Sequence, residues 1–170
     1  AEEPEIVRLE TSIEEKESST NFLKIQIDKH DRNRYGICDV FSPPRVCLAA
    51  REQGLRGGWS IDIAIRDPGI GRRFDLRNSK DQKEVKRMIR RDSPTVLVVS
   101  PPCTAFSIAN QGEVDKQTLS AAVDMIRLSI GICELQHKSG RHFIFEQPQS
   151  SRALSLNEFV QMAYRDGIAN

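Results

Sequence analysis

The chain of 170 residues carries a formal net charge of +1, so no overall positive charge attracts it to nucleic acid, and any such binding must come from a local patch. Its length predicts one domain with a substantial core, and 38% hydrophobic against 29% charged residues is the composition of an ordinary globular protein. Because no apolar run is long enough to span a membrane, we expect no membrane partner.

The four cysteines are predicted to be free thiols. They show neither C-x-x-C spacing nor metal-ligand spacing with the histidines, as is usual in a reducing compartment, and the acidic residues 1–4 do not resemble a signal peptide. We therefore expect an intracellular protein of the nucleus or cytoplasm, not a secreted one, and no bound metal. The cysteines are Cys38, Cys47, Cys103 and Cys133.

Two regions follow from the composition along the chain. Residues 1–34 are predicted to form a charged amino-terminal extension, in which a capping-box pattern at residues 11–14 favours a short helix. Over residues 35–170, strand and helix patterns alternate, as in an α/β domain. Parallel pairing with right-handed crossovers makes a mostly parallel, doubly wound sheet the expected architecture.

The predicted elements rest on apolar periodicity and on the turn residues at their ends. Prolines follow three of the strands, glycines end two of the helices, and a capping-box pattern at residues 79–82 begins another helix. In chain order we predict strand 37–41, helix 45–53, strand 59–63, strand 74–76, helix 79–90, strand 95–99, a long helix from Leu119 towards Gly140, strand 142–146 and a last amphipathic helix over about 156–164.

Side chains with functional potential lie at or just beyond the end of every predicted strand. They are Asp39, Asp62, Asp75, Cys103 and Glu146. In open α/β sheets the carboxyl ends of the strands share one edge, and ligands bind there. The most informative of these positions is Cys103, because a buried strand runs into Pro101-Pro102 directly before it. The prolines hold the loop stiff, which favours presentation of the sulfur over its burial.

These residues, in this order, resemble the cytosine-5 DNA methyltransferase family. Asp39-Val40-Phe41-Ser42 is similar to the first motif of that family, and Ser100-Pro101-Pro102-Cys103, with Phe106-Ser107 downstream, resembles its Pro-Cys catalytic loop. Phe145-Glu146-Gln147-Pro148 resembles its Glu-Asn-Val segment. The resemblance covers roughly residues 36–150 and implies a Rossmann-like, S-adenosylmethionine-dependent methyltransferase fold that is truncated at the carboxyl terminus.

The resemblance also implies a cofactor, a substrate and a set of roles. The cofactor would be S-adenosyl-L-methionine, and the substrate nucleic acid, DNA in preference to RNA. In that family the cysteine attacks C6 of a cytosine that has left the duplex stack. Cys103 would be the nucleophile, Glu146 would hold the N3 and N4 edge of the base, and Pro101, Ser107 and Gln147 would belong to the substrate loop. The predicted cofactor residues are Phe41, Ser42, Arg45, Asp62 (at the ribose), Ile63, Asp75 and Leu76 (at the adenine), Ser100 and Pro102.

The chain departs from the family pattern in three places. Ser42-Pro43-Pro44 stands where the family has a glycine-rich loop, so the methionine end of a cofactor needs another anchor, and we expect Arg45 to pair with its carboxylate. The alternative is that Arg45 belongs only to a rigid helix start. Gln147 replaces an asparagine. Nothing corresponds to the target-recognition domain, which indicates a fragment, a further domain or protein that completes the site, or loss of catalysis.

Structural interpretations remain open for the same residues. Asp62 could be a turn or helix-cap residue, Cys103 a small buried hydrophobe, and Glu146 a solvated carboxylate. The basic residues at 83, 86, 87, 90 and 91 favour a solvated helix face over a phosphate site.

For the whole chain, the alternatives are a catalytically inactive nucleotide- or partner-binding domain and a base amino-methyltransferase. The latter usually has an aromatic residue where Cys103 stands.

Overall fold

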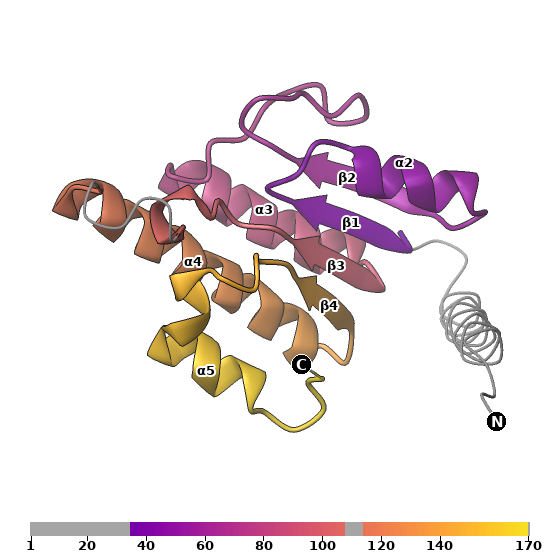
Figure 1. The fold of residues 1–170 in the computed structure, drawn as a ribbon. Helices are drawn as coiled ribbons and strands as arrows, with labels where there is room; N and C mark the ends of the chain where they lie inside the picture. Colours follow the sequence, from indigo (N-terminus) through magenta and orange to yellow (C-terminus); the bar gives the residue numbers. More distant parts are fainter. Residues whose placement is uncertain (1–34, 108–113, 170) are drawn as a thin grey trace, which may run out of the picture. The chain divides into compact units, whose positions relative to one another are not determined.

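The computed structural model describes residues 35–107 and 114–169. The extension predicted for residues 1–34, with its capping-box pattern, lies outside these ranges. Four parallel strands form one sheet in the order β2-β1-β3-β4 (Figure 1), which confirms the α/β class and is compatible with a Rossmann-like arrangement. The elements are β1 (Ile37–Val40), α2 (Arg45–Glu52), β2 (Gly57–Ile61), α3 (Ser79–Asp92), β3 (Val96–Val99), η1 (Thr104–Phe106), α4 (Lys116–Lys138), β4 (His142–Phe145), η3 (Arg152–Ser155) and α5 (Asn157–Ala163).

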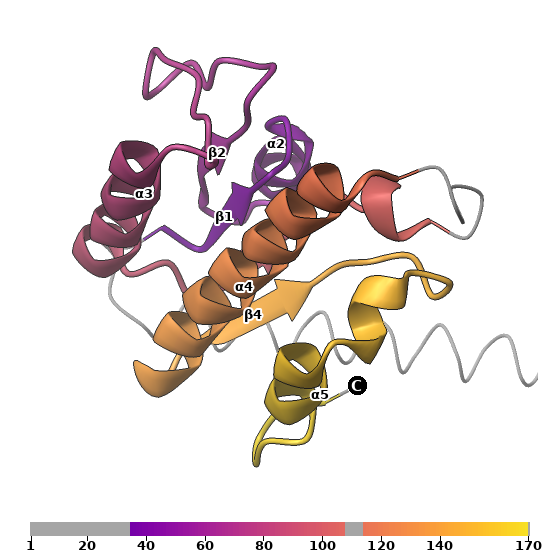
Figure 2. The same ribbon diagram turned by 90° about the vertical axis from the view of Figure 1, so that its left-hand side faces the viewer.

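Helices cover both faces of this sheet. α2 packs on β1 and β2, while α4 packs on β3 and β4 and also contacts α3. Figure 2 shows α2 and α3 on opposite sides of β1 and β2. The chain runs from β1 to β2 in one direction along the sheet and from β2 to β3 and β4 in the other, so right-handed crossovers place the helices on opposite faces. The reversal creates a switch point between β1 and β3, where open α/β sheets bind ligands.

The two central strands supply the middle of the core. Val40 in β1 and Leu97 and Val99 in β3 are fully buried, and each such side chain contributes about 1.5–3 kcal/mol by leaving water. Gln136 of α4 is also fully buried, and its Nε2 donates to the Pro94 carbonyl at 2.6 Å. None of the helices within the described ranges combines the length and apolarity needed to cross a membrane.

Side-chain caps set the starts of the two longer helices. Asn78, and not Ser79, is the N-cap of α3, since its side chain accepts from the Lys80 N–H at 2.8 Å. The predicted capping box was therefore placed one residue too late. Asp115 caps α4 by accepting from two backbone N–H groups, so this helix begins three residues before Leu119.

The predicted strand at 74–76 is wrong. Phe74 and Leu76 are buried on either side of a half-buried Asp75, and this alternation is typical of a strand. The backbone nevertheless forms no ladder, because the Asp75 N–H donates to the Asp81 carboxylate at 2.8 Å instead. The segment lies at the end of β2 and leads into α3.

The strand predicted at 59–63 is shifted towards the amino terminus. β2 begins at Gly57, which is easily missed because glycine weakens a strand. A Cβ on Gly57 would stand 2.1 Å from the Cys47 carbonyl oxygen, so only glycine allows α2 to approach β2 this closely. β2 ends at Ile61, and Asp62 and Ile63 therefore belong to the loop beyond it.

Candidate functional site

A pocket of about 450 Å³ lies at the carboxyl ends of β1, β2 and β3. It brings together six of the nine predicted cofactor residues, which come from four separate segments of the sequence. Its volume is within the range usual for small-molecule sites. Those six residues are Phe41, Asp62, Ile63, Asp75, Leu76 and Pro102.

The remaining wall of this pocket comes from one face of α4. Thr118, Ala121, Ala122 and Met125 line it, and the sequence interpretation assigned none of them to the site. The signal that could have found them is the pair of small residues at positions 121 and 122, followed by Met125 one turn later. Small side chains on one helix face leave room for a ligand between that helix and the sheet.

Phe41 reaches the pocket through an unusual backbone conformation. Its φ is 66°, a left-handed value that costs a bulky L-residue about 1–2 kcal/mol. The conformation is held because the N–H groups of Phe41 and Ser42 both donate to the Ile61 carbonyl, at 2.7 and 3.2 Å. The chain therefore turns sharply after β1 without the glycine that normally permits such a turn, and the aromatic side chain lines the pocket.

The two acids of the pocket already have internal partners. Asp62 Oδ1 accepts from the N–H groups of Ala64 and Ile65 at 2.6 and 2.7 Å, a turn arrangement in which Oδ2 takes no part. The Asp75 carboxylate accepts from Arg77 Nε and Nη2 at 2.8 and 2.7 Å. This side-chain hydrogen bonding lowers the pKa of Asp75. Both interpretations of Asp62, as turn residue and as ligand acceptor, are compatible with this geometry.

Three predicted cofactor residues do not line the pocket. Arg45 is exposed at the first position of α2, where its N–H donates to the Pro43 carbonyl at 2.6 Å. The Ser42 hydroxyl also donates to Pro43, at 3.0 Å. Ser100 lies at the end of β3, where its N–H donates to the Val40 carbonyl at 3.1 Å. Arg77 is the guanidinium that the pocket does contain, and it is paired with Asp75.

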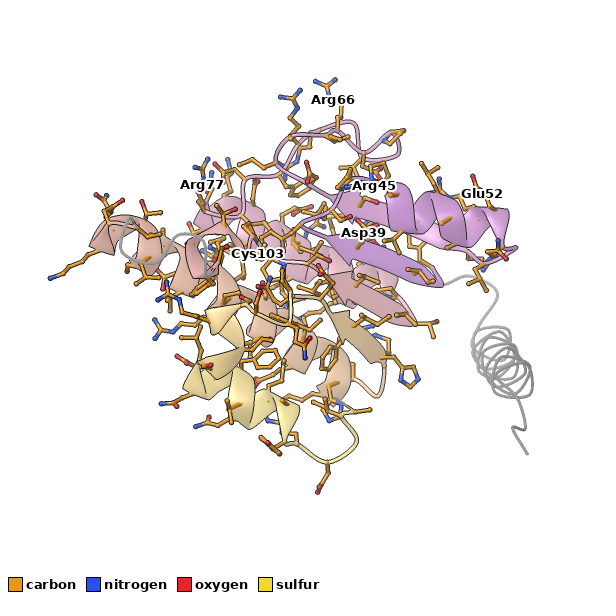
Figure 3. All side chains as sticks on the ribbon, viewed as in Figure 1. Asp39, Arg45, Glu52, Arg66, Arg77 and Cys103 are labelled. Atoms are coloured by element: carbon orange, nitrogen blue, oxygen red, sulfur yellow. The ribbon has the colours of Figure 1, made fainter. Side chains whose placement is uncertain are left out.

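Cys103 lies in the loop after β3, directly before η1 (Figure 3). It is half-buried, and its carbonyl accepts from the Phe106 N–H at 2.9 Å. Phe106 is buried in the core and anchors the far end of the loop. Pro101 is buried and Pro102 is exposed. The loop thus holds the thiol partly accessible, whereas the other three cysteines are fully buried.

A second pocket, also of about 450 Å³, lies beside this loop. Pro102, Thr118 and Ala122 line both pockets, so the two cavities share a wall. Cys103 lies between two residues of the second pocket, Pro102 and Thr104. The described residues therefore form two adjoining cavities of small-molecule size; Cys103 and Glu146 line neither of them, although Pro102 and Thr104, which flank Cys103, line the second.

The segment after β4 is fastened to the cysteine loop. The Glu146 N–H donates to the Val99 carbonyl at 2.9 Å, which extends the pairing of β3 and β4 by one residue. Gln147 Nε2 then donates to the Pro101 carbonyl at 2.6 Å, and Gln147 Oε1 accepts from the Ser151 hydroxyl at 2.9 Å. The Glu146 side chain is exposed. The loops that carry Cys103 and Glu146 are thus held side by side, and Ser107, half-buried, follows η1.

Asp39 has a structural role that the sequence did not reveal. Its carboxylate is fully buried in the middle of the sheet and does not line either pocket. Within the described part of the chain, neither of its oxygens, nor the facing Ser60 hydroxyl, has a hydrogen-bond partner of good geometry. Burial raises the pKa of Asp39 to about 6, although Ser60 and the start of α2 at Cys47 oppose the increase.

Two further predictions concern charge and metal. On α3, Arg87 pairs with Glu84 and Arg91 pairs with Asp92, so part of its basic run is neutralised, as expected for a solvated face. Among the residues that the structure describes, no three His, Cys, Asp or Glu side chains are grouped so that they could hold a metal ion.

Comparison of the chain with protein-family models, with curated proteins and with solved structures finds no match.

Proposed function

We propose that this chain is an S-adenosylmethionine-dependent methyltransferase domain of the cytosine-5 type that acts on DNA. The observation that carries the proposal is the common wall of the two cavities, because group transfer requires a donor site and an acceptor site that lie next to each other. The donor cavity, lined by Phe41 and Asp62, lies at the switch point of the sheet. The acceptor cavity lies beside Cys103.

The residues of the donor cavity suit an adenosine-containing cofactor. Apolar walls from Phe41, Ile63 and Leu76 would enclose the adenine, and Asp62 Oδ2 would accept from the ribose hydroxyls, as acids after the second strand do in doubly wound folds. Asp75 would lie near the adenine edge. When bound, S-adenosylmethionine supplies an activated methyl group.

Cys103 and Glu146 would activate the base. The Cys103 thiolate forms a bond from Sγ to C6 of an extruded cytosine, and the electron pair of the C5–C6 double bond moves towards C5. The Glu146 carboxyl group would contact the N3 and N4 edge of the base, where it would balance the charge that develops in the ring. Transfer of the methyl group to C5 would release S-adenosylhomocysteine; loss of the C5 proton to water and breakage of the bond from Sγ to C6 would then restore the thiolate and the C5–C6 double bond.

Covalent trapping tests this proposal. A DNA duplex with 5-fluorocytosine cannot lose the C5 substituent as a proton, so with S-adenosylmethionine the wild-type chain is expected to form a stable adduct at Cys103. Cys103→Ser, which keeps the size of the side chain, should form none while it binds the cofactor with unchanged affinity in calorimetry. Cofactor binding without an adduct on the wild-type protein would contradict the catalytic step.

One observation favours a second candidate, a catalytically inactive binding domain. Asp62 and Asp75 both make hydrogen bonds inside the protein, so the two acids expected to hold the cofactor are already engaged. An inactive domain needs no affinity for S-adenosylmethionine. Calorimetry with the cofactor alone therefore separates the two candidates, because saturable heat with one site per chain supports the enzyme and its absence supports the binding domain.

A further inference from the structure

The loop between β2 and α3, which borders the donor cavity, contains four arginines and three aspartates. We call residues 62–78 the arginine loop, because four of its positions are arginines. Figure 3 shows Arg66 projecting from the outer part of this loop and Arg77 near the start of α3. The two ends of the arginine loop form part of the cavity wall through Asp62, Ile63, Asp75, Leu76 and Arg77. The four arginines are Arg66, Arg72, Arg73 and Arg77.

The backbone of the arginine loop is held by a buried carboxylate. Asp67 is 5% exposed and accepts from the N–H groups of Ser60, Gly69 and Ile70 at 2.9, 2.8 and 3.0 Å. Such charge-assisted bonds to backbone N–H groups are strong. A loop fixed in this way loses little conformational entropy when it binds a partner.

Two arginines are neutralised inside the protein and two are not. Arg72 pairs with Asp81 at 2.9 Å and lies over the Phe74 ring at 3.7 Å, and Arg77 pairs with Asp75. Arg66 and Arg73 are exposed, and the described residues give neither of them an ion pair. Asp67 keeps its negative charge but is buried, whereas Arg66 and Arg73 are exposed, so the exposed unpaired charges on the outer part of the arginine loop are positive.

Exposed apolar side chains accompany these cations. Ile63 is 52% exposed and Ile65 is 45% exposed. Arginine is enriched at binding surfaces, and Ile63 and Ile65 add exposed apolar area beside it. In nucleic-acid complexes, arginine binds phosphate and aliphatic side chains wedge against bases.

We propose that the arginine loop is the surface that binds the backbone of the nucleic acid substrate, with Arg66 and Arg73 on consecutive phosphates and Ile65 against the bases. The inference rests on the proposed function, for which it names a surface that would hold the nucleic acid substrate.

Salt dependence of DNA binding tests this assignment. Binding of the full chain to a fluorescein-labelled 20-base-pair duplex of mixed sequence is measured by anisotropy between 50 and 200 mM salt. Each lost phosphate contact reduces the slope of log K against log salt by about 1. Arg66→Ala with Arg73→Ala is therefore expected to reduce the slope by about 2 and to weaken binding at least tenfold at the lowest salt.

The matched control is Lys83→Ala with Arg90→Ala, which removes the same charge from exposed positions on α3. It should leave the slope unchanged. Equal effects of the two double variants, or no binding of the wild-type chain at 50 mM salt, would overturn the assignment. Calorimetry with S-adenosylmethionine is run on every variant. If the cofactor binds normally and the two double variants have the same salt slope, only the assignment of the arginine loop is rejected. If their slopes differ but the cofactor does not bind, only the methyltransferase proposal is rejected.

Discussion

At the scale of single residues, Phe41 shows how a strained position can point to a site. A phenylalanine with φ of 66° is tolerated only where the surroundings determine it, and such positions are concentrated at ligand sites. Here the Ile61 carbonyl fixes the turn from one side, and the ring lines the donor cavity. The strain and the location together support the proposal that the aromatic side chain contacts a ligand.

Substitution of Phe41 separates its backbone effect from its side-chain effect. Phe41→Ala keeps a left-handed non-glycine residue and removes the ring, whereas Phe41→Gly removes the ring and the strain. The glycine variant is expected to be more stable than the alanine variant by about 1 kcal/mol in urea unfolding. Both variants should lose cofactor affinity equally in calorimetry. Wild-type affinity in both variants would show that the ring does not contact the cofactor.

At the scale of elements, most strands were predicted close to where they lie, but one predicted strand does not form. β1, β3 and β4 begin and end within one residue of the predicted ranges, because β-branched and aromatic runs followed by prolines leave few other structures. The strand predicted at 74–76 is wrong because buried and half-buried side chains alternate there although the backbone does not pair with another strand. Its hydrogen bond to Asp81 depends on a side chain of α3, which no local pattern reveals.

The candidate site was predictable where it follows strand ends and unpredictable where it depends on packing. Phe41, Asp62 and Pro102 meet in one cavity because parallel strands end at a common edge. The exclusion of Arg45 and the contribution of Ala122 depend instead on how α2 and α4 lie against the sheet. Those orientations follow from tertiary contacts that the order of residues does not display.

The bond from Gln147 to Pro101 is the contact between elements that holds the cysteine loop. Gln147→Glu keeps an acceptor for Ser151 but replaces the donor with an oxygen that faces the Pro101 carbonyl. The loop should loosen, and alkylation of Cys103 by iodoacetamide should become several-fold faster, since the other cysteines are fully buried. A loss of stability of about 1–3 kcal/mol should accompany this change.

Ser151→Ala is the control for that prediction. It removes the hydrogen bond at 2.9 Å from the other side of Gln147 and leaves the contact with Pro101 in place. Its alkylation rate should stay close to that of the wild-type protein. Equal acceleration in both variants would show that the cysteine loop is held by the whole segment after β4 and not by the Gln147 amide.

At the scale of the whole molecule, one buried carboxyl group lies in the middle of the sheet. β1 is paired on both edges, with β2 and with β3, and Asp39 faces Ser60 across the first of these pairs. A group in the central strand becomes exposed only when the sheet opens, so its titration is coupled to global unfolding and not to local fraying. Stability as a function of pH therefore reports on the centre of the fold.

The pKa of Asp39, raised by burial to about 6 from an ordinary value of 3.8, makes this coupling measurable. Between about pH 4 and pH 6 the folded chain keeps a proton that the unfolded chain has lost, so the free energy of unfolding falls as pH rises through this range. The shift corresponds to about 3 kcal/mol. Asp39→Asn cannot titrate, and its stability relative to the wild-type protein should increase by about that amount from pH 4 to pH 7 in urea unfolding. The control is Asp166→Asn, which also removes one carboxyl group but at an exposed position. If the stability of both variants depends on pH in the same way, net charge controls the effect, and burial at the centre of the sheet does not.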